Sequence, residues 1–148
     1  MSRILFIAFS VLVWFTAFAK ADIHDYKVLR VVDGDTIVIE AKFLPPELGD
    51  RLSLRVLHVD TPEKGHLAKC DLERQKSKQA TDFVVGVIAS AKEVKVELKK
   101  WDKYGGRVLG DLIIDGSRLS KKLIDFGFAV EYNGEKKTKD WCQKKSML

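Results

Sequence analysis

Residues that build zinc sites are scarce in this sequence, which contains two cysteines and three histidines in 148 residues. The cysteines, Cys70 and Cys142, are isolated, and none of the histidines has a nearby partner at the spacing of zinc ligands. Zinc binding is therefore the less favoured interpretation of the two cysteines.

Internal repeats and low-complexity linkers are also absent after residue 21. The length suits one domain and leaves little room for a second. Neither sign of charge dominates, because 26 lysines and arginines face 21 acidic residues, for a formal net charge of +5. This modest positive charge allows attraction to a polyanion without requiring it. Since the charges are well mixed, we interpret lysine runs such as Lys136-Lys137 as solvated surface rather than as a binding patch.

The first 21 residues differ from the rest of the chain. Arg3 supplies a positive charge, residues 4–18 are almost uninterruptedly apolar, and residues 19–21 have the small residues of a cleavage site. This pattern predicts a signal peptide over residues 1–21, followed by a domain over residues 22–148. The alternative is an uncleaved anchor, but the apolar run is shorter than the roughly 20 residues of a spanning helix. We expect a secreted or periplasmic protein without stable membrane association.

Export changes the interpretation of the two cysteines. Outside the cytosol such a pair usually forms a disulfide, so we predict a bond between Cys70 and Cys142. It would close a loop of about 70 residues and stabilise the domain by roughly 4 kcal/mol on chain-entropy grounds. Trp141 and Cys142 are then expected to hold the carboxyl-terminal tail against the body near Cys70.

The hydrophobic pattern predicts five short strands and two helices. The strands are expected over residues 26–32, 35–41, 52–59, 94–99 and 108–114. Apolar residues three or four positions apart predict a helix that includes residues 80–91 and a second helix from Leu119, ended by Gly127. A helix between the third and fourth strands and another after the fifth favour a small, closed, five-stranded β-barrel of the OB type. A mixed, open α+β sheet is the alternative.

Three acidic residues lie at the ends of predicted strands. Asp35 follows a predicted tight turn, and Asp60 and Glu63 come where the third strand ends. Carboxylates at strand ends can converge on a hard cation, which prefers oxygen ligands. Each also has a purely structural interpretation, with Asp35 as a turn residue and Thr61-Pro62 as the start of a helix.

Two arginines complete the set of candidate residues. Arg55 lies within an apolar strand, where a covered guanidinium needs an acidic or phosphate partner. Arg107 follows a loop whose two glycines permit close approach of the backbone to a ligand. Two guanidinium groups facing a metal would bind a phosphoryl group and stabilise the charge of its transition state. The alternative is two structural ion pairs, for example Arg55 with Asp60.

Three motifs, in order, connect these residues to a known family. They are VDGDT at 32–36, RVLHVDTPE at 55–63 and DKYGGR at 102–107, and together they closely resemble the staphylococcal nuclease (thermonuclease) family. The resemblance runs from about residue 28 to residue 132. It implies an OB-type barrel with packed helices, and calcium-dependent hydrolysis of DNA and RNA that leaves 3′-phosphates.

The resemblance also implies roles for the acidic motif residues. Asp35 and Asp60 are expected to bind calcium through their carboxylates, and Thr61 through its backbone carbonyl. Glu63 falls on the position that orients or deprotonates the attacking water.

The basic and aromatic positions complete this assignment. Arg55 and Arg107 fall on the two phosphate-binding positions of the family. Lys103 and Tyr104 match positions that contact the nucleotide, and Tyr132 loosely matches a nucleotide-stacking tyrosine.

The sequence departs from the family pattern in three places. Gly106 adds a residue before Arg107, so that Arg107 must reach the phosphate from a slightly different loop. His58 occupies a position that is usually apolar, and we interpret it as a strand residue rather than a catalytic one. The tail after Asn133 is too short for a full third helix.

Three functions from different classes fit this set of residues. They are a calcium-dependent nuclease, a catalytically silent OB-type nucleic-acid-binding module, and an exported domain whose ionic residues only pair with one another. Glu63 favours the nuclease, because neither binding nor folding requires a residue that handles water. We expect a monomeric endonuclease with DNA and RNA as its substrates.

Overall fold

The computed structural model of the protein describes residues 22–103 and 105–143. The predicted signal peptide and Tyr104 therefore lie outside the described residues. The elements in chain order are β1 (Asp22–His24), β2 (Val28–Val31), β3 (Thr36–Glu40), η1 (Pro46–Leu48), β4 (Arg51–Val56), β5 (Val59–Asp60), η2 (Gly65–Leu67), α1 (Asp71–Ser90), β6 (Val94–Trp101), β7 (Arg107–Ile114), β8 (Ser117–Arg118), α2 (Leu119–Asp125) and β9 (Val130–Glu131). No helix in these two ranges combines the length and apolar character needed to cross a bilayer.

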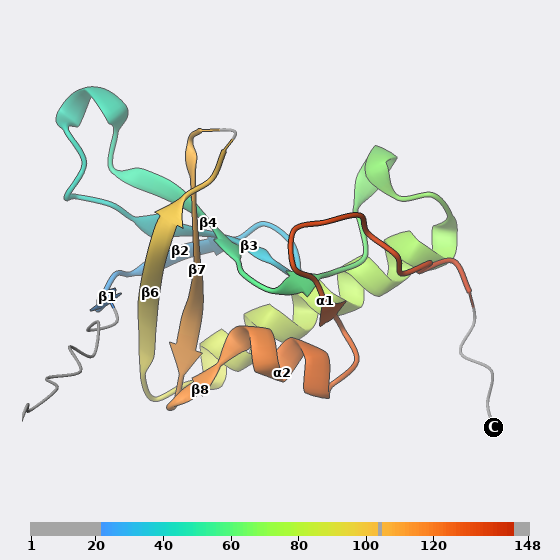
Figure 1. Ribbon diagram of the computed structural model, residues 1–148. Coiled ribbons are helices and arrows are strands. Elements are labelled where there is room, and N and C mark those ends of the chain that lie inside the picture. The colour runs from blue at the N-terminus through green and yellow to red at the C-terminus, as the bar shows by residue number, and fades with distance from the viewer. Residues whose placement is uncertain (1–21, 104, 144–148) are drawn as a thin grey trace, which may run out of the picture.

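Seven strands form one mixed sheet, and β5 and β9 form a separate antiparallel pair. The main sheet has the order β1-β6-β7-β4-β3-β2, with β8 pairing β7 (Figure 1). Within this order β4 and β7 run parallel, and the other neighbours run antiparallel.

The prediction of a closed five-stranded barrel needs correction. The hydrogen-bonded order found for the described residues is open, with β1 and β2 at its two ends. These two strands belong to one stretch of chain, interrupted at residues 25–27, and each pairs with a different neighbour. Several strands of a mixed sheet with two helices are confirmed, in the predicted order.

The predicted third strand, residues 52–59, is divided by a turn at Leu57-His58. His58 has a φ of 63°, in the left-handed region that residues other than glycine rarely adopt. The chain therefore leaves the main sheet after β4 and continues as β5, so the expectation that His58 is a strand residue was wrong. This turn directs Asp60 toward the second sheet, where it pairs with Val130 of β9.

Both predicted helices are present. The first begins at Asp71, well before its apolar repeat. The N–H of Glu73 donates to the Sγ of Cys70, which caps the helix, and the two acidic residues of the first turn stabilise its amino-terminal end. Gly127 follows α2 with a φ of 73°, and its N–H donates to the carbonyl of Ile124. Glycine is suited to this position, as predicted.

A helix start at Thr61-Pro62 is not observed. The chain instead passes from β5 through an irregular segment and the single turn η2 before α1 begins. The structural interpretation of Thr61 as a helix cap was therefore wrong.

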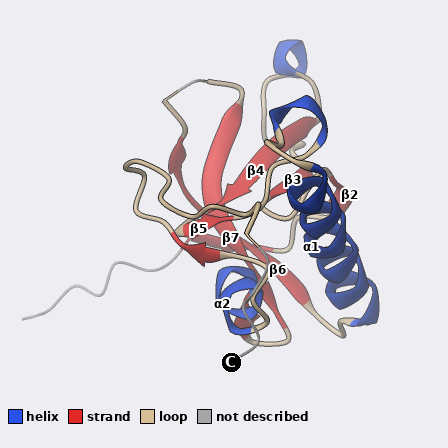
Figure 2. Cartoon of the chain, turned by 90° about the vertical axis from the view of Figure 1, so that its right-hand side faces the viewer, coloured by secondary structure: helices blue, strands red, loops and turns tan. Residues whose placement is uncertain are grey.

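The core fixes which residues of the sheet face outward. Ile37 and Ile39 of β3 and Leu54 of β4 are fully buried, and α2 contributes Leu119 and Leu123. Side chains alternate along a strand, so the residues between these positions face away from the core. In Figure 1 both helices lie at one end of the sheet, and the loop at residues 41–50 extends from the other; Figure 2 shows α1 running along one side of the strands.

Candidate active site

Arg55 and Asp35 meet where β3 and β4 pair. Arg55 lies opposite Thr36 in the ladder, and the N–H of Val56 donates to the carbonyl of Asp35 (2.8 Å). One guanidinium nitrogen of Arg55 lies 2.9 Å from a carboxylate oxygen of Asp35. The ion pair suggested for Arg55 is therefore real, but its partner is Asp35 rather than Asp60.

Asp35 is almost inaccessible, with 2% of its surface exposed. Burial raises the pKa of its carboxyl to about 6, although the nearby Arg55 charge and a hydrogen bond from Thr61 act in the opposite direction. Gly34 makes this packing possible, because a Cβ at that residue would lie 3.1 Å from Cγ2 of Thr61. The result is a buried carboxylate whose ionised form would gain from a further cation.

Asp60 is equally buried, and the tail covers both of its carboxylate oxygens. The indole N–H of Trp141 donates to Oδ2 (3.3 Å), and the ammonium of Lys137 lies 2.6 Å from Oδ1. The lysine contact is an ion pair without hydrogen-bond geometry, so Oδ1 is a buried acceptor with no hydrogen-bond partner. A buried acceptor of this kind is a candidate for binding a cation.

Glu63 contacts the same lysine. Its Oε1 lies 2.6 Å from the ammonium of Lys137, and 37% of its side chain is exposed. Burial opposes the charge on Lys137, but its close contacts with the carboxylates of Asp60 and Glu63 outweigh this effect and raise its pKa. The sequence did not identify Lys137 as a site residue, because the Lys136-Lys137 run was interpreted as solvated surface.

Arg107 begins β7 on the same face of the sheet as Arg55. It lies opposite Ser53 in the parallel β4–β7 ladder, two positions from Arg55, and alternation puts all three side chains outward. The Nε–H of Arg107 donates to Oδ2 of Asp102 (2.7 Å). The extra residue, Gly106, has a φ of 63° and is accommodated within the turn before β7.

The predicted nucleotide-contacting residues are less well defined. Lys103 lies exposed in the loop between β6 and β7, and Tyr104 lies outside the described residues. Tyr132 follows β9; its N–H donates to the carbonyl of His58 (3.1 Å), and its hydroxyl donates to the carbonyl of Glu135 (2.6 Å). These bonds connect Tyr132 to the turn before β5 on one side and to the start of the following tail on the other.

Two further side chains position the loop that carries Glu63. The buried carboxylate of Glu73 accepts the N–H groups of Glu63 (3.2 Å) and Lys69 (2.7 Å). Lys64 donates to the carbonyl of Val32 (2.8 Å), in the segment that precedes Asp35. Glu73 stands three residues after the helix cap, as the glutamate of a capping box does, but the cap is Cys70 and the carboxylate accepts from Glu63 and Lys69 instead, so the sequence pattern does not indicate this role.

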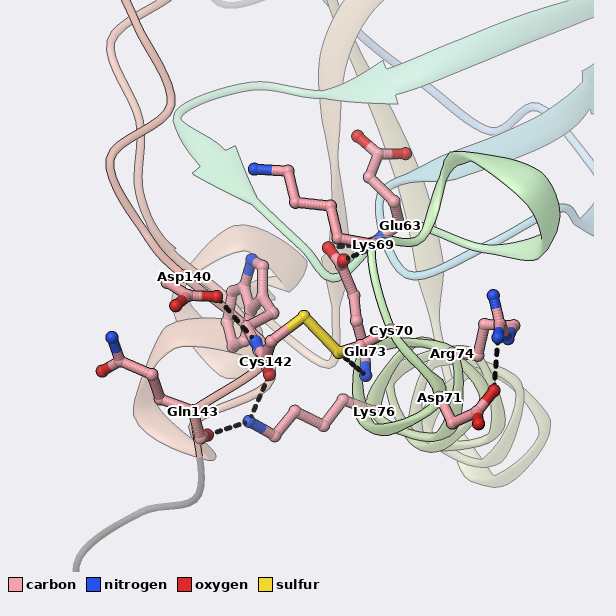
Figure 3. Close-up of a disulfide and its surroundings, with 11 residues drawn as sticks. Glu63, Lys69, Cys70, Asp71, Glu73, Arg74, Lys76, Asp140, Cys142 and Gln143 are labelled. Carbon is pink, nitrogen blue, oxygen red and sulfur yellow. Dashed lines mark hydrogen bonds and ion pairs between the residues drawn. A yellow bond between two sulfur atoms is a disulfide. The ribbon is translucent and has the colours of Figure 1, made fainter.

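The predicted disulfide joins Cys70 at the start of α1 to Cys142 in the tail (Figure 3). Both sulfurs are used, which excludes these cysteines as zinc ligands. The ammonium of Lys76 donates to the carbonyls of Trp141 (2.7 Å) and Gln143 (2.9 Å). The expectation that Trp141 and Cys142 hold the tail near Cys70 is confirmed.

The donor set suits a hard divalent cation. Within residues 22–103 and 105–143, no three His, Cys, Asp or Glu side chains are grouped so as to hold a metal. Asp35 and Asp60 nevertheless offer two buried carboxylates, and Thr61 a backbone carbonyl, while water commonly completes such sites. The buried Oδ1 of Asp60, which lacks a hydrogen bond, supports this fit.

An open cavity of about 450 Å³ lies elsewhere, beside α2. Its lining includes His58, Ser120 and Asp125 and none of the predicted catalytic or metal-binding residues. We place the candidate site at the carboxylates and arginines instead, because the predicted catalytic and metal-binding residues gather there and not around this cavity.

The family described as "Staphylococcal nuclease homologue" matches residues 53–147. The chain belongs to this family. A thermonuclease from Staphylococcus hyicus is 33% identical over 114 residues, which cover 75% of this chain and 61% of that protein. Two uncharacterized endonucleases, from Escherichia coli and Escherichia coli O157:H7, are each 31% identical over 114 residues, covering 76% of this chain and 63% of theirs. The chain thus spans less than two thirds of the length of these relatives.

The staphylococcal nuclease match includes most of the candidate site. Arg55, Asp60, Glu63 and Arg107 lie within the matched residues, as does the tail with Lys137. Asp35 precedes the match and reaches the site through the pairing of β3 with β4.

Proposed function

We propose that this protein is a calcium-dependent endonuclease that hydrolyses phosphodiester bonds of DNA and RNA and leaves 3′-phosphates. The observation that carries the proposal is the placement of Arg55 and Arg107 on one outward face, with Arg55 bonded to the buried carboxylate of Asp35. The names of its relatives, a thermonuclease and two endonucleases, support the same class of reaction.

Asp35, Asp60 and the backbone carbonyl of Thr61 would hold the cation. When bound, it polarises the phosphate and favours deprotonation of water. The two carboxylates supply the negative charge that holds a divalent ion, and their burial strengthens that attraction by excluding water.

The arginines bind the substrate phosphate. A guanidinium has five N–H donors, so Arg55 can keep one bond to Asp35 and offer others to a phosphate oxygen. Arg107 exchanges part of its contact with Asp102 for the phosphate. Both charges stabilise the equatorial oxygens as negative charge grows on them in the transition state.

Glu63 handles the water. Its carboxylate is partly exposed at the edge of the carboxylate cluster, and it orients a water molecule or accepts its proton. The water oxygen bonds to phosphorus, the bond to the 5′ oxygen breaks, and that oxygen takes a proton. The products are a 3′-phosphate and a 5′-hydroxyl.

We further propose that the protein is exported, acts in the periplasm or the medium, and works as a monomer without stable membrane association. The disulfide supports this location, because such bonds persist in oxidising compartments. The pattern of residues 1–21 is the other support.

The deciding experiment compares cleavage of single-stranded DNA and RNA by the purified protein in calcium, in magnesium and in excess chelator. We expect cleavage with calcium and none with chelator, restored when calcium is returned. Cleavage that persists in chelator would contradict the metal assignment. Binding without cleavage under all three conditions would favour the silent nucleic-acid-binding module.

A further inference from the structure

The tail, defined here as residues 134–143, is fastened at its far end. Cys142 is bonded to Cys70 at the start of α1 (Figure 3). Trp141 is buried, and its carbonyl accepts a hydrogen bond from Lys76. Trp141 also donates from its indole to Asp60. These contacts fix the path of the tail beside the segment that follows β5.

This path brings Lys137 to two candidate site residues. Its ammonium lies 2.6 Å from Oδ1 of Asp60 and 2.6 Å from Oε1 of Glu63. Lys137 is 74 residues from Glu63 in the sequence, so only the fastened tail brings them together. Because Trp141 holds the other oxygen of Asp60, the tail contacts both atoms through which Asp60 could bind a cation.

An ammonium and a divalent cation compete for the same oxygen. Calcium and magnesium bind carboxylate oxygens at about 2.0–2.6 Å, which is also the range of the present lysine contact. Two positive charges within a few ångströms repel strongly in a site from which water is excluded. A cation that uses Oδ1 of Asp60 therefore has to displace Lys137.

Displacement needs no unfolding of the tail. The side chain of Lys137 is 38% exposed, so its ammonium has a route to solvent by rotation about its own bonds. The fastening points, Trp141 and Cys142, lie four and five residues further along and can stay in place. The lysine can then return when the cation leaves.

We propose that Lys137 is a further residue of the active site, a resident cation that bridges Asp60 and Glu63, competes with the divalent metal for Asp60 and sets the metal affinity. The proposal rests on the proposed function, in which Asp60 is a metal ligand. The disulfide-fastened tail is the element that keeps this competitor at the site.

The test is calcium binding without substrate, measured by titration calorimetry on four full-length proteins: wild type, Lys137→Met, Lys136→Met and Asp60→Asn. Lys137→Met keeps the length of the side chain and removes its charge, and we expect about tenfold tighter binding. Lys136→Met is the matched control, since it removes the same charge from the neighbouring exposed residue, and we expect a change within about twofold.

The outcomes separate this inference from the proposed function. Equal affinities of Lys137→Met and Lys136→Met, or weaker binding by Lys137→Met, would overturn the role of Lys137. Calcium affinity that Asp60→Asn leaves unchanged would instead overturn the metal assignment of the proposed function, and the inference with it. Circular dichroism of each variant shows whether it is folded.

The fastening is tested by mild reduction of the disulfide. Once Cys142 is released from Cys70, Lys137 is held less firmly, and calcium binding is expected to tighten in protein that circular dichroism shows to be folded. Unchanged affinity in folded, reduced protein would overturn the role of the disulfide. Loss of the fold on reduction would show that the tail is required for the domain, and Lys137→Met would then carry the test alone.

Discussion

Two groups of carboxylates in this protein have the same arrangement of charges but differ in how many of their hydrogen bonds are made. In each group a basic side chain lies between two acidic ones. In the first group, here called the β6–β7 cluster, Arg118 lies between Glu97 and Asp111. In the second, here called the Asp60 cluster, Lys137 lies between Asp60 and Glu63.

The β6–β7 cluster is fully bonded. Glu97 accepts hydrogen bonds from both terminal nitrogens of Arg118, one of them at 2.9 Å, and forms an ion pair with Lys99 at 2.8 Å. These bonds, the one from Arg118 foremost, lower the pKa of Glu97 to about 2 against the effect of burial. Asp111 accepts both the N–H (3.2 Å) and the hydroxyl (2.5 Å) of Ser120 at the start of α2, although burial still raises the pKa of its carboxyl. Such a cluster stabilises the fold and leaves little for a ligand to add.

The Asp60 cluster is neutralised but incompletely bonded. Oδ1 of Asp60 is buried without a hydrogen bond, and nearby Asp35 has a carboxyl whose pKa is raised by burial to about 6. Buried carboxylates left in this condition are more typical of functional sites than of structural ones. The two clusters are alike in charge balance and differ in the hydrogen bonds that their buried carboxylates make, which fits the proposed division between site and scaffold.

The largest expected effect belongs to Glu63→Gln. Removing the group that handles water should lower turnover on single-stranded DNA with calcium by about 10³-fold. The side chain is partly exposed, so the free energy of unfolding in urea should change by about 0.5 kcal/mol or less. Unchanged turnover would remove Glu63 from the mechanism, and a large loss of stability would make the Asp60 cluster structural as well.

Glu97→Gln should show the opposite pattern. Arg118 loses its nearer charged partner and keeps only the longer contact with Asp111, and we expect the free energy of unfolding at pH 7 to fall by about 2 kcal/mol. This is less than for a fully buried pair, because the side chain of Arg118 is 47% exposed. Turnover per folded molecule should stay within about twofold of wild type. A large loss of turnover in folded protein would contradict the separation of the two clusters.

The same variant predicts a dependence on pH. The carboxyl of Glu97 has a pKa of about 2 in the folded protein against an ordinary 4.5, so its contribution is complete above pH 4.5 and is lost as pH falls toward 2. With screening through the exposed Arg118, that contribution is about 1–2 kcal/mol. Urea unfolding of wild type and Glu97→Gln at pH 5 and pH 2.5 should show the gap between them narrowing at the lower pH.

The local parts of this comparison could be predicted from the sequence. Strands and helices follow from hydrophobic periodicity, and Asp35, Arg55 and Asp60 were predicted as site residues because they stand in short motifs. The disulfide followed from the cysteine count and the predicted export. Each of these inferences uses information within a few residues or within one residue type.

The parts that failed depend on distant pairing or on backbone conformation. Nothing near Lys137 in the sequence indicates Asp60, and the lysine reaches it only through the path of the fastened tail. The turn at His58 needs a positive φ, and a histidine in the sequence does not indicate that conformation. The open order of the sheet arises because β1 and β2 pair with different neighbours, which periodicity cannot show.

The smallest expected effect is that of Ser120→Ala, which removes one bond from the fully bonded cluster. The hydroxyl donates to Oδ2 of Asp111, while the N–H groups of Ser120 and Leu112 still donate to Oδ1. We expect the free energy of unfolding to fall by about 1 kcal/mol in urea at pH 7, because Asp111 is buried and part of its hydrogen bonding is lost.

Ser90→Ala is the matched control for this change. It removes a hydroxyl that donates to the carbonyl of Gly86 at the exposed end of α1, and should cost about 0.5 kcal/mol or less. Equal losses of unfolding free energy in the two variants would mean that the bond to Asp111 stabilises the fold no more than an exposed hydroxyl bond does. A fall in turnover per folded molecule in Ser120→Ala would show that the β6–β7 cluster acts on the Asp60 cluster, against the division between scaffold and site.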